Sequence, residues 1–342
     1  MRAFAPGRVT LIGDHTDYNE GVSLPMAVDL GTEVCFAPDD GLRVVLRAAG
    51  EPDLADVDIH VPLDPAALAE VQPRWARYVA GVVAAVRPTA GGRGTVEGTV
   101  PVGSGLASSA SLQVALALAL GFRAEPPVMA EVLQRAEQAA TGVPAGLLDQ
   151  LTITGGRAGH ALLVDLHDRS LQPVPVPDGA EIIAVDSGER RTLARTGYAA
   201  RRAECDAAAA RLGPLGRIGP ADFMGIPDAV LRRRVRHVVT ECDRVRWCAD
   251  ALASGDLAEA GRLMLASHRS LAEDFEVSTP ALDQLVALLA SLPGVHGARL
   301  TGAGFGGCVV ALAEPGAVDL TALATPAWRL RPAGAARVTR DP

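Results

Sequence analysis

Aromatic residues and cysteines are both scarce in this chain. Phe, Trp and Tyr make up 4% of the residues, so we expect helices that pack mainly through small aliphatic side chains. The cysteines are odd in number and scattered, at Cys35, Cys205, Cys242, Cys248 and Cys308. They form no C-x-x-C pair, and no histidine lies near them at the spacing of a zinc site. This pattern argues against a disulfide framework and favours reduced, mostly buried thiols in a cytoplasmic protein.

The chain also lacks an excess of positive charge and any long hydrophobic run. Its 40 acidic residues outnumber 32 basic ones, for a formal net charge of −8, and we therefore expect no nucleic-acid partner. The longest apolar run, Val114–Leu120, is too short to cross a bilayer. The N-terminus reaches a polar loop before an apolar core can form, unlike a signal peptide. We predict a cytoplasmic protein with no membrane partner, either a monomer or a weak homo-oligomer.

What the chain does have is a hydrophobic content of 49% over 342 residues, which is typical of a globular protein with two domains. Three prolines, at positions 173, 175 and 177, lie between strands predicted at Ala161–Asp165 and Glu181–Asp186. We place the domain boundary there, giving domains 1–178 and 179–342.

Hydrophobic periodicity predicts the main elements. Strands are expected at 9–12, 42–46, 57–61 and 94–100, and helices at 75–86, from the serines near 108 to about 122, and at 127–141, 192–212, 227–254, 257–266 and 280–292. The Arg-rich stretch Arg232–Arg236 is most simply a solvated helix face.

The segment Pro101–Ser111 is rich in glycine and serine and leads into an apolar run. It predicts a loop that enters a helix, with Gly103 and Gly105 allowing a close backbone approach to a ligand. Serines in the segment could cap the helix, and its free N–H groups and dipole favour phosphate. The spacing matches neither the P-loop nor the dinucleotide fingerprint. An ordinary glycine-rich turn that caps a core helix is an equally good interpretation of this segment alone.

A second polar segment follows the predicted strand Val9–Ile12. A turn at Gly13 presents Asp14, His15, Asp17 and Tyr18 together, close to Arg8. An isolated acidic turn is usually solvated surface, but this one is flanked by apolar strand residues on both sides. Polar loops held on a rigid scaffold are where binding residues tend to lie.

Two further acids and a second glycine cluster complete the candidates. Glu137 lies in a predicted helix, and two glycines and a proline hold Asp149 on a turn after it. Taken singly, Glu137 could be an exposed helical acid and Asp149 a helix cap. The segment Gly302–Gly307 holds four glycines in six residues, which implies that its backbone closely approaches something.

Together these segments resemble the superfamily of small-molecule kinases named for galactokinase, homoserine, mevalonate and phosphomevalonate kinases (GHMP kinases), and within it the galactokinases. Gly7–Asn19 closely follows the galactokinase signature, Pro101–Ser111 the ATP-phosphate loop, and Gly302–Cys308 the closing glycine motif. The resemblance covers nearly the whole chain. It implies a two-domain α+β fold, an ATP- and sugar-binding N-terminal domain, a C-terminal kinase domain, and an active site in the cleft between them.

The resemblance also implies the chemistry and its residues. Phosphate would pass from ATP to the anomeric hydroxyl of galactose or a galactose-like sugar, with Asp149 as the catalytic carboxylate and Arg8 as its partner. Ser109 and Glu137 would hold Mg²⁺. The sugar pocket would be formed by Asp14, His15, Asp17, Gly146 and Tyr198. The ATP phosphates would lie along Gly103, Ser104, Gly105, Leu106, Ala107, Ser108, Ser109 and Ala110.

The sequence departs from the galactokinase pattern at three positions. Galactokinases normally carry Glu where this chain has Asp14, and that Glu contacts the C6 hydroxyl of the sugar. Asp is shorter by one carbon–carbon bond, about 1.5 Å. Thr10 replaces the usual Asn, and Ala107 a usual Ser.

Two alternatives stay open, the first of them because of these departures. One is a 1-kinase for a modified or higher-carbon sugar in secondary metabolism. The other is a regulatory relative that binds sugar and ATP without catalysis.

Overall fold

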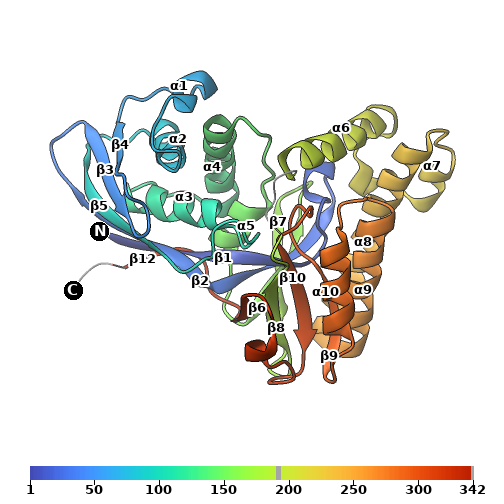
Figure 1. Cartoon of the computed structure of the whole chain (residues 1–342). Helices are drawn as coiled ribbons and strands as arrows, with labels where there is room; N and C mark the ends of the chain where they lie inside the picture. The colour runs from blue at the N-terminus through green and yellow to red at the C-terminus, as the bar shows by residue number, and fades with distance from the viewer. Residues whose placement is uncertain (190–193, 340–342) are drawn as a thin grey trace.

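The computed structural model describes residues 1–189 and 194–339. The chain forms two lobes, each built on a sheet with helices against it (Figure 1). The N-terminal lobe contains an eight-stranded sheet in which six strands follow the order β12-β1-β2-β5-β3-β4, and β6 joins β7 to β2. The C-terminal lobe contains a four-stranded sheet of order β11-β8-β10-β9. This arrangement is the predicted α+β fold.

The N-terminal lobe contains the strands and helices predicted from the sequence, along with others that were not predicted, α5 and β7 among them. Its strands are β1 (Arg2–Ile12), β2 (Val22–Pro38), β3 (Arg43–Ala48), β4 (Ala55–Asp58), β5 (Gly92–Gly98), β6 (His160–Asp165), β7 (Ser170–Pro175) and β12 (Arg337–Thr339). Its helices are α1 (Pro65–Ala69), α2 (Ala76–Val86), α3 (Ser108–Ala119), α4 (Pro126–Thr141) and α5 (Leu148–Gly155), with a 3₁₀ turn η1 at Asp17–Asn19.

The C-terminal lobe is largely helical, as expected. It contains β8 (Glu181–Asp186), β9 (Val295–Leu300), β10 (Cys308–Ala313) and β11 (Ala327–Leu330), and the helices α6 (Ala194–Leu212), α7 (Pro220–Met224), α8 (Ala229–Ser254), α9 (Leu257–Glu273) and α10 (Pro280–Ala290). Two 3₁₀ turns, η2 (Leu215–Arg217) and η3 (Leu320–Ala322), complete it. The first two residues of the helix predicted at 192–212 lie outside the described residues.

The two lobes share one hydrophobic core. Val9, Leu11 and Leu24 from β1 and β2 belong to the same buried cluster as side chains of α8, β9 and β10. A second buried cluster lies in the N-terminal lobe, between the sheet and α2–α4. The end of β1 is therefore enclosed by the C-terminal lobe, and the loop that follows it emerges between the two lobes.

Two strands, one in the proline-rich region and one near the C-terminus, were not predicted from the sequence. Pro173 and Pro175 lie in strand β7, which pairs only with β6, whereas the sequence suggested a connecting segment. An edge strand tolerates proline because one side of it needs no ladder hydrogen bond. The last described strand, β12, returns to pair with β1, so the N-terminal sheet takes in part of the predicted C-terminal domain. The boundary at 178 stays a prediction.

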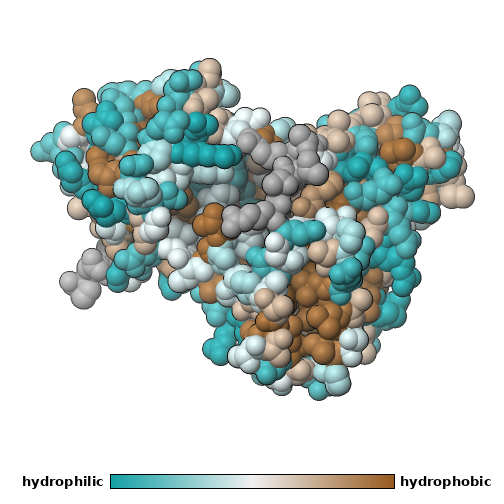
Figure 2. Space-filling model, viewed as in Figure 1, coloured by the Kyte–Doolittle hydropathy of each residue, from teal (hydrophilic) through white to brown (hydrophobic). Residues whose placement is uncertain are grey.

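The face shown in Figure 2 is mostly hydrophilic, with a hydrophobic area low on the C-terminal lobe. Within the described residues, no helix combines the length and the hydrophobicity that a transmembrane segment requires.

Candidate active site

A cavity of about 300 Å³ lies between the lobes. Its lining is Arg8, Asp14, His15, Asp17, Glu137, Val143, Pro144, Ala145, Gly146, Leu148, Asp149, Gln150, Tyr198, Gly302 and Ala303. All the side chains predicted from the sequence for catalysis and sugar binding are among them, together with Glu137. The glycine-rich loop 103–110 does not line the cavity, but it contacts two of the lining side chains.

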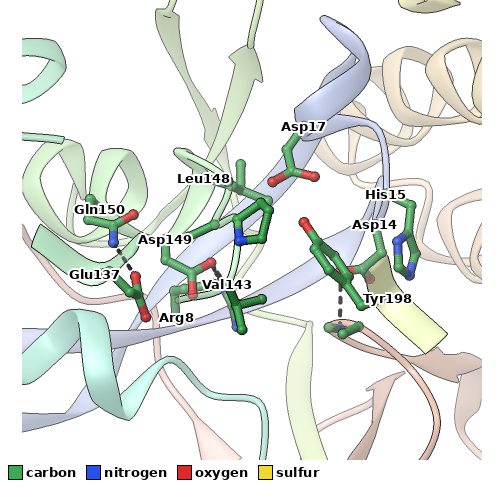
Figure 3. A pocket seen from close by; sticks show the side chains of 15 residues that line it. Arg8, Asp14, His15, Asp17, Glu137, Val143, Leu148, Asp149, Gln150 and Tyr198 are labelled. Carbon is green, nitrogen blue, oxygen red and sulfur yellow. Dashed lines mark hydrogen bonds and ion pairs between the residues drawn. The ribbon is translucent and has the colours of Figure 1, made fainter. Parts of the chain in front are cut away.

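Arg8 and Asp149 form a close ion pair at one end of the cavity (Figure 3). Arg8 is buried on β1, and Asp149 lies in the first turn of α5. The guanidinium Nε and Nη2 are 2.8 and 2.7 Å from Asp149 Oδ1. Arg8 Nη1 also donates to the carbonyl oxygen of Gly105, 2.5 Å away. One guanidinium therefore connects the carboxylate to the glycine-rich loop.

The glycine-rich loop has the backbone that the sequence predicted but not the predicted cap. Gly103 and Gly105 have φ of +79° and +93°, which favours glycine. The N-cap of α3 is Ala107, with a left-handed φ of 60° and no side-chain cap hydrogen bond. The expectation of a serine cap was wrong, because Ala107 occupies the N-cap position, and the hydroxyls of Ser109 and Ser111 bond to Glu137 and to the Ala5 carbonyl oxygen instead. The first N–H groups of α3 have no partner within the helix, and no side chain in the described part of the chain caps them.

Ser109, Glu137 and Gln150 form a small polar group beside the Arg8–Asp149 pair. Ser109 Oγ donates to Glu137 Oε1 at 3.0 Å, and Gln150 Nε2 donates to Glu137 Oε2 at 2.7 Å. Burial, and then the negative charge of Asp149, raise the pKa of Glu137. A cation bound nearby would stabilise the ionised form of this carboxylate. The described residues contain no cluster of three or more His, Cys, Asp or Glu side chains suited to a metal.

The loop after β1 forms the other end of the cavity (Figure 3). His15 has a left-handed φ of 65°, which is uncommon for a residue with a side chain. Two neighbours hold this conformation: Asn19 Nδ2 donates to the His15 carbonyl at 2.8 Å, and Thr16 Oγ1 lies 2.9 Å from the Gly13 carbonyl oxygen. The polar side chains of the loop are thus fixed by the fold rather than solvated.

Asp17 lies against the backbone of Gly146. A Cβ at Gly146 would overlap Oδ2 of Asp17, so only glycine allows this approach. Burial, followed by the nearby charges of Asp149 and Asp14, raises the pKa of Asp17 to about 6. Gly146 therefore fixes where the Asp17 carboxylate can lie, while the surrounding acids make it easy to protonate.

Aromatic rings surround His15. Its ring centroid is 4.7 Å from that of Phe275 and 5.9 Å from that of Tyr198, and Nδ1 lies 2.9 Å from the Tyr18 hydroxyl. Burial and the neighbouring His237 lower the pKa of His15 to about 3. The ring is therefore neutral and offers one nitrogen to a polar ligand. Few aromatics are present in the chain, and several of them gather here.

Sequence reasoning missed several residues at this site. Arg299 lies fully buried on β9 and pairs with Asp14; a lone arginine inside an apolar strand was the available signal. Arg234, assigned to a solvated face, is 1% exposed and pairs with Glu204 and Glu276. Helical position alone could not place it, because burial of that face depends on α6 and on the segment after α9.

Three family models match the chain. They are the galactokinase galactose-binding signature at residues 1–38, the GHMP kinases N terminal domain at 77–157 and the GHMP kinases C terminal model at 248–324. The first contains Arg8 and the cavity loop, and the second contains the glycine-rich loop, Glu137 and Asp149.

Known proteins resemble the chain over most of its length. The galactokinases of Chloroflexus aggregans and Homo sapiens are each 41% identical to it, over 93% and 92% of this chain and 85% and 83% of theirs. The structure of Lactococcus lactis galactokinase complexed with galactose superposes with a TM-score of 0.89 at 28% identity, covering 98% of this chain and 94% of that one. A mevalonate kinase structure, with a TM-score of 0.67 at 18% identity over 97% and 98% of the two chains, shares the fold.

Proposed function

This chain belongs to the galactokinase family of GHMP kinases, and from that premise we propose that it transfers the γ-phosphate of ATP to the anomeric hydroxyl of galactose. The observation that carries the proposal is the Arg8–Asp149 pair. It contacts the glycine-rich loop on one side and shares a cavity with the polar loop at Asp14–Asp17 on the other.

Asp149 is proposed as the group that accepts the hydroxyl proton of the sugar. Phosphoryl transfer depends mainly on alignment and charge neutralisation, so a carboxylate within reach of the attacking oxygen is sufficient. Arg8 contacts this carboxylate directly and holds it in place. The same guanidinium can stabilise negative charge as it develops on the attacking oxygen.

ATP is proposed to place its phosphates against the loop 103–110 and the N-terminus of α3. Twelve residues of α3 direct a positive dipole end and uncapped N–H groups toward this position. An adjacent cavity of about 340 Å³ shares Glu137 and Val143–Ala145 with the first one. It offers room for the remainder of the nucleotide.

The donor set at Ser109 and Glu137 fits Mg²⁺. A hydroxyl and a carboxylate oxygen 3.0 Å apart are hard ligands, and this ion commonly keeps several waters and binds nucleotide phosphates. When bound, it would neutralise phosphate charge. Without a cation, Glu137 and Asp149 would repel a triphosphate. Gln150 keeps the Glu137 carboxylate in place through Oε2.

The sugar is proposed to occupy the end formed by Asp14, His15, Asp17 and Tyr198. Carboxylates, a neutral imidazole and a phenol provide the directional acceptors and donors that sugar hydroxyls require. Gly146 leaves its backbone exposed to the same space.

The test is to incubate the purified protein with ATP, MgCl₂ and single sugars, and to identify products by ³¹P and ¹H NMR. We expect galactose 1-phosphate, with little product from glucose, mevalonate or homoserine. A strong preference for sugars extended beyond C6 would contradict the assignment of galactose. Sugar and ATP binding without turnover would instead indicate a regulatory protein.

A further inference from the structure

Fully buried charges lie behind the cavity loop, on the side away from the sugar position. Arg299 on β9 and Glu241 on α8 are both 0% exposed, and neither lines the cavity. Both come from the C-terminal lobe. Burying a charge is costly in free energy unless the charge is paired and hydrogen-bonded. The interaction partners of Arg299 and Glu241 therefore indicate the role of each residue.

Arg299 is directed at Asp14 and at the strand that leads to it. Its Nη1 lies 2.8 Å from Asp14 Oδ2 and 3.3 Å from the carbonyl oxygens of Thr10 and Leu11. Its Nε and Nη2 have no hydrogen-bond partner within residues 1–189 and 194–339. The pair with Asp14 is therefore the main compensation for burying this guanidinium.

Asp14 is held at both carboxylate oxygens. Oδ1 accepts the N–H of Gly302 at 3.0 Å, and Oδ2, which has no hydrogen-bond partner among the described residues, forms an ion pair with Arg299 Nη1 at 2.8 Å. Each carboxylate oxygen can accept two hydrogen bonds, so a direction remains free for a ligand in the cavity that Asp14 lines. The carboxylate is only 5% exposed, and this pairing sets the direction in which it points.

Glu241 holds the backbone of the same loop separately. Its Oε1 accepts the Gly13 N–H at 3.0 Å and the Ser267 hydroxyl at 2.5 Å, and Oε2 pairs with Arg244 at 2.8 Å. Burial would raise its pKa, but the charges led by Arg244 lower the pKa of Glu241 to about 2. The backbone of the loop thus has an anchor of its own, which remains in place when Arg299 is removed.

We propose that Arg299 is a positioning residue for sugar binding, which fixes the direction and balances the charge of the Asp14 carboxylate at the sugar end of the cavity. This inference rests on the proposed galactose kinase function and names a residue of the C-terminal lobe that determines sugar affinity without touching the sugar. Because Asp14 lies at the opposite end of the cavity from Asp149 (Figure 3), its loss should affect binding of the sugar more than the transfer step.

The experiment compares Arg299→Met, Asp14→Asn and the double variant with the unaltered protein. Truncating one partner of a buried charge pair is strongly unfavourable, and we expect Arg299→Met to raise the KM for galactose about 10- to 100-fold. The KM for ATP should stay within about twofold and kcat should change less than the galactose KM. Arg299→Lys, which retains the charge, should recover part of the affinity.

The double variant separates positioning from a merely structural role. Once Asp14→Asn has removed the charge, the additional Arg299→Met change should have little further effect on galactose KM, which is the non-additivity expected of a coupled pair. Effects that multiply independently would overturn the proposal. If Arg299→Met alone does not fold, the double variant should fold better, and an equal loss in both would also overturn it.

Arg329→Met is a matched control in the same sheet. Arg329 on β11 pairs with Glu181 at 2.9 Å, is 44% exposed at its side chain and does not line the cavity, so its galactose KM should be unchanged. If the unaltered protein phosphorylates no sugar, the proposed function fails. If it is active and Arg299→Met leaves galactose KM unchanged, only the role of Arg299 fails.

Discussion

The two ends of the cavity are built in different ways. At the transfer end, Arg8, Asp149, Glu137 and Ser109 all come from the N-terminal lobe and form two directly contacting pairs, Arg8–Asp149 and Ser109–Glu137. At the sugar end, the loop that carries Asp14 also belongs to the N-terminal lobe, but its supports, Arg299 and Glu241 among them, come from the C-terminal lobe. The first end is assembled within one lobe and the second depends on both.

This difference has a chemical counterpart. The transfer end pairs its carboxylate with a guanidinium in the open cavity, where charge must be neutralised during the reaction. At the sugar end, the charged supports are buried behind the loop, and the groups that face the cavity include a neutral His15 and an easily protonated Asp17. We therefore expect changes at the transfer end to lower kcat, and changes at the sugar end to raise the KM for galactose.

The largest effect should come from Asp149→Asn. The amide keeps an oxygen near Arg8 but loses the basic carboxylate, so kcat should fall on the order of 10²- to 10⁴-fold with little change in the galactose KM. Steady-state kinetics with galactose and ATP measure both. Asp56→Asn is the control, because Asp56 forms an exposed pair with Arg43 away from the cavity. Near-normal kcat in Asp149→Asn would remove this residue from the mechanism.

Glu137→Gln tests whether the transfer end binds Mg²⁺ through Glu137. The substitution removes the negative charge but leaves the side chain about the same size. The Mg²⁺ concentration for half-maximal activity should therefore rise about tenfold, which corresponds to a loss of about 1.4 kcal/mol of Mg²⁺ binding free energy. Titrating MgCl₂ at fixed ATP measures it. Glu131→Gln lies on the same helix, at an exposed pair with Arg169, and should leave the Mg²⁺ response unchanged. An unaltered response in Glu137→Gln would argue against this ligand.

Gly146→Ala tests the sugar end through shape alone. Its Cβ would overlap the Asp17 carboxylate, so Asp17 must move and the galactose KM should rise about tenfold, or roughly 1.4 kcal/mol of binding. Gly179→Ala is the matched control, since a Cβ there meets nothing within 4 Å. If Gly146→Ala lowered kcat and left the KM unchanged, the contrast between the two ends would fail.

The smallest effect should appear in the pH dependence. Asp17 has its pKa raised from about 3.8 to about 6, so lowering the pH through 6 protonates it and removes an acceptor for sugar hydroxyls. The kcat/KM for galactose, which reports groups of the free enzyme, should therefore decrease below about pH 6. Asp17→Asn should lose this inflection. An inflection that persists in Asp17→Asn belongs to another group.

Much of the fold could be predicted because its elements have local signals. Periodicity predicted α2 and α4 within a residue of their observed ends, and β8 at its observed bounds. The short helix α5 was missed: Asp149 was expected on a turn, because glycine and proline precede it and only eight residues are helical. Strand β7 was missed because prolines in an edge strand look like those of a connecting segment.

The same distinction between local signals and distant contacts applies to the residues of the candidate site. The resemblance of three motifs to the galactokinases selected Arg8, Asp149, Glu137 and the loop at Asp14, and their roles stay predictions. It could not select Arg299 or Gln150, whose significance comes from contacts with residues far away in the chain, such as Asp14 at 2.8 Å across the two lobes.

By itself, the sequence determined most of the strands and helices, where the backbone needs glycine, and which polar residues lie together on a loop, because periodicity, turn chemistry and motif spacing are properties of neighbours in the chain. Only the tertiary structure decided which charges are buried and which group compensates each of them. Desolvation and pairing depend on every atom packed around a charge, and at Asp14 the atoms that matter come from the opposite end of the polypeptide.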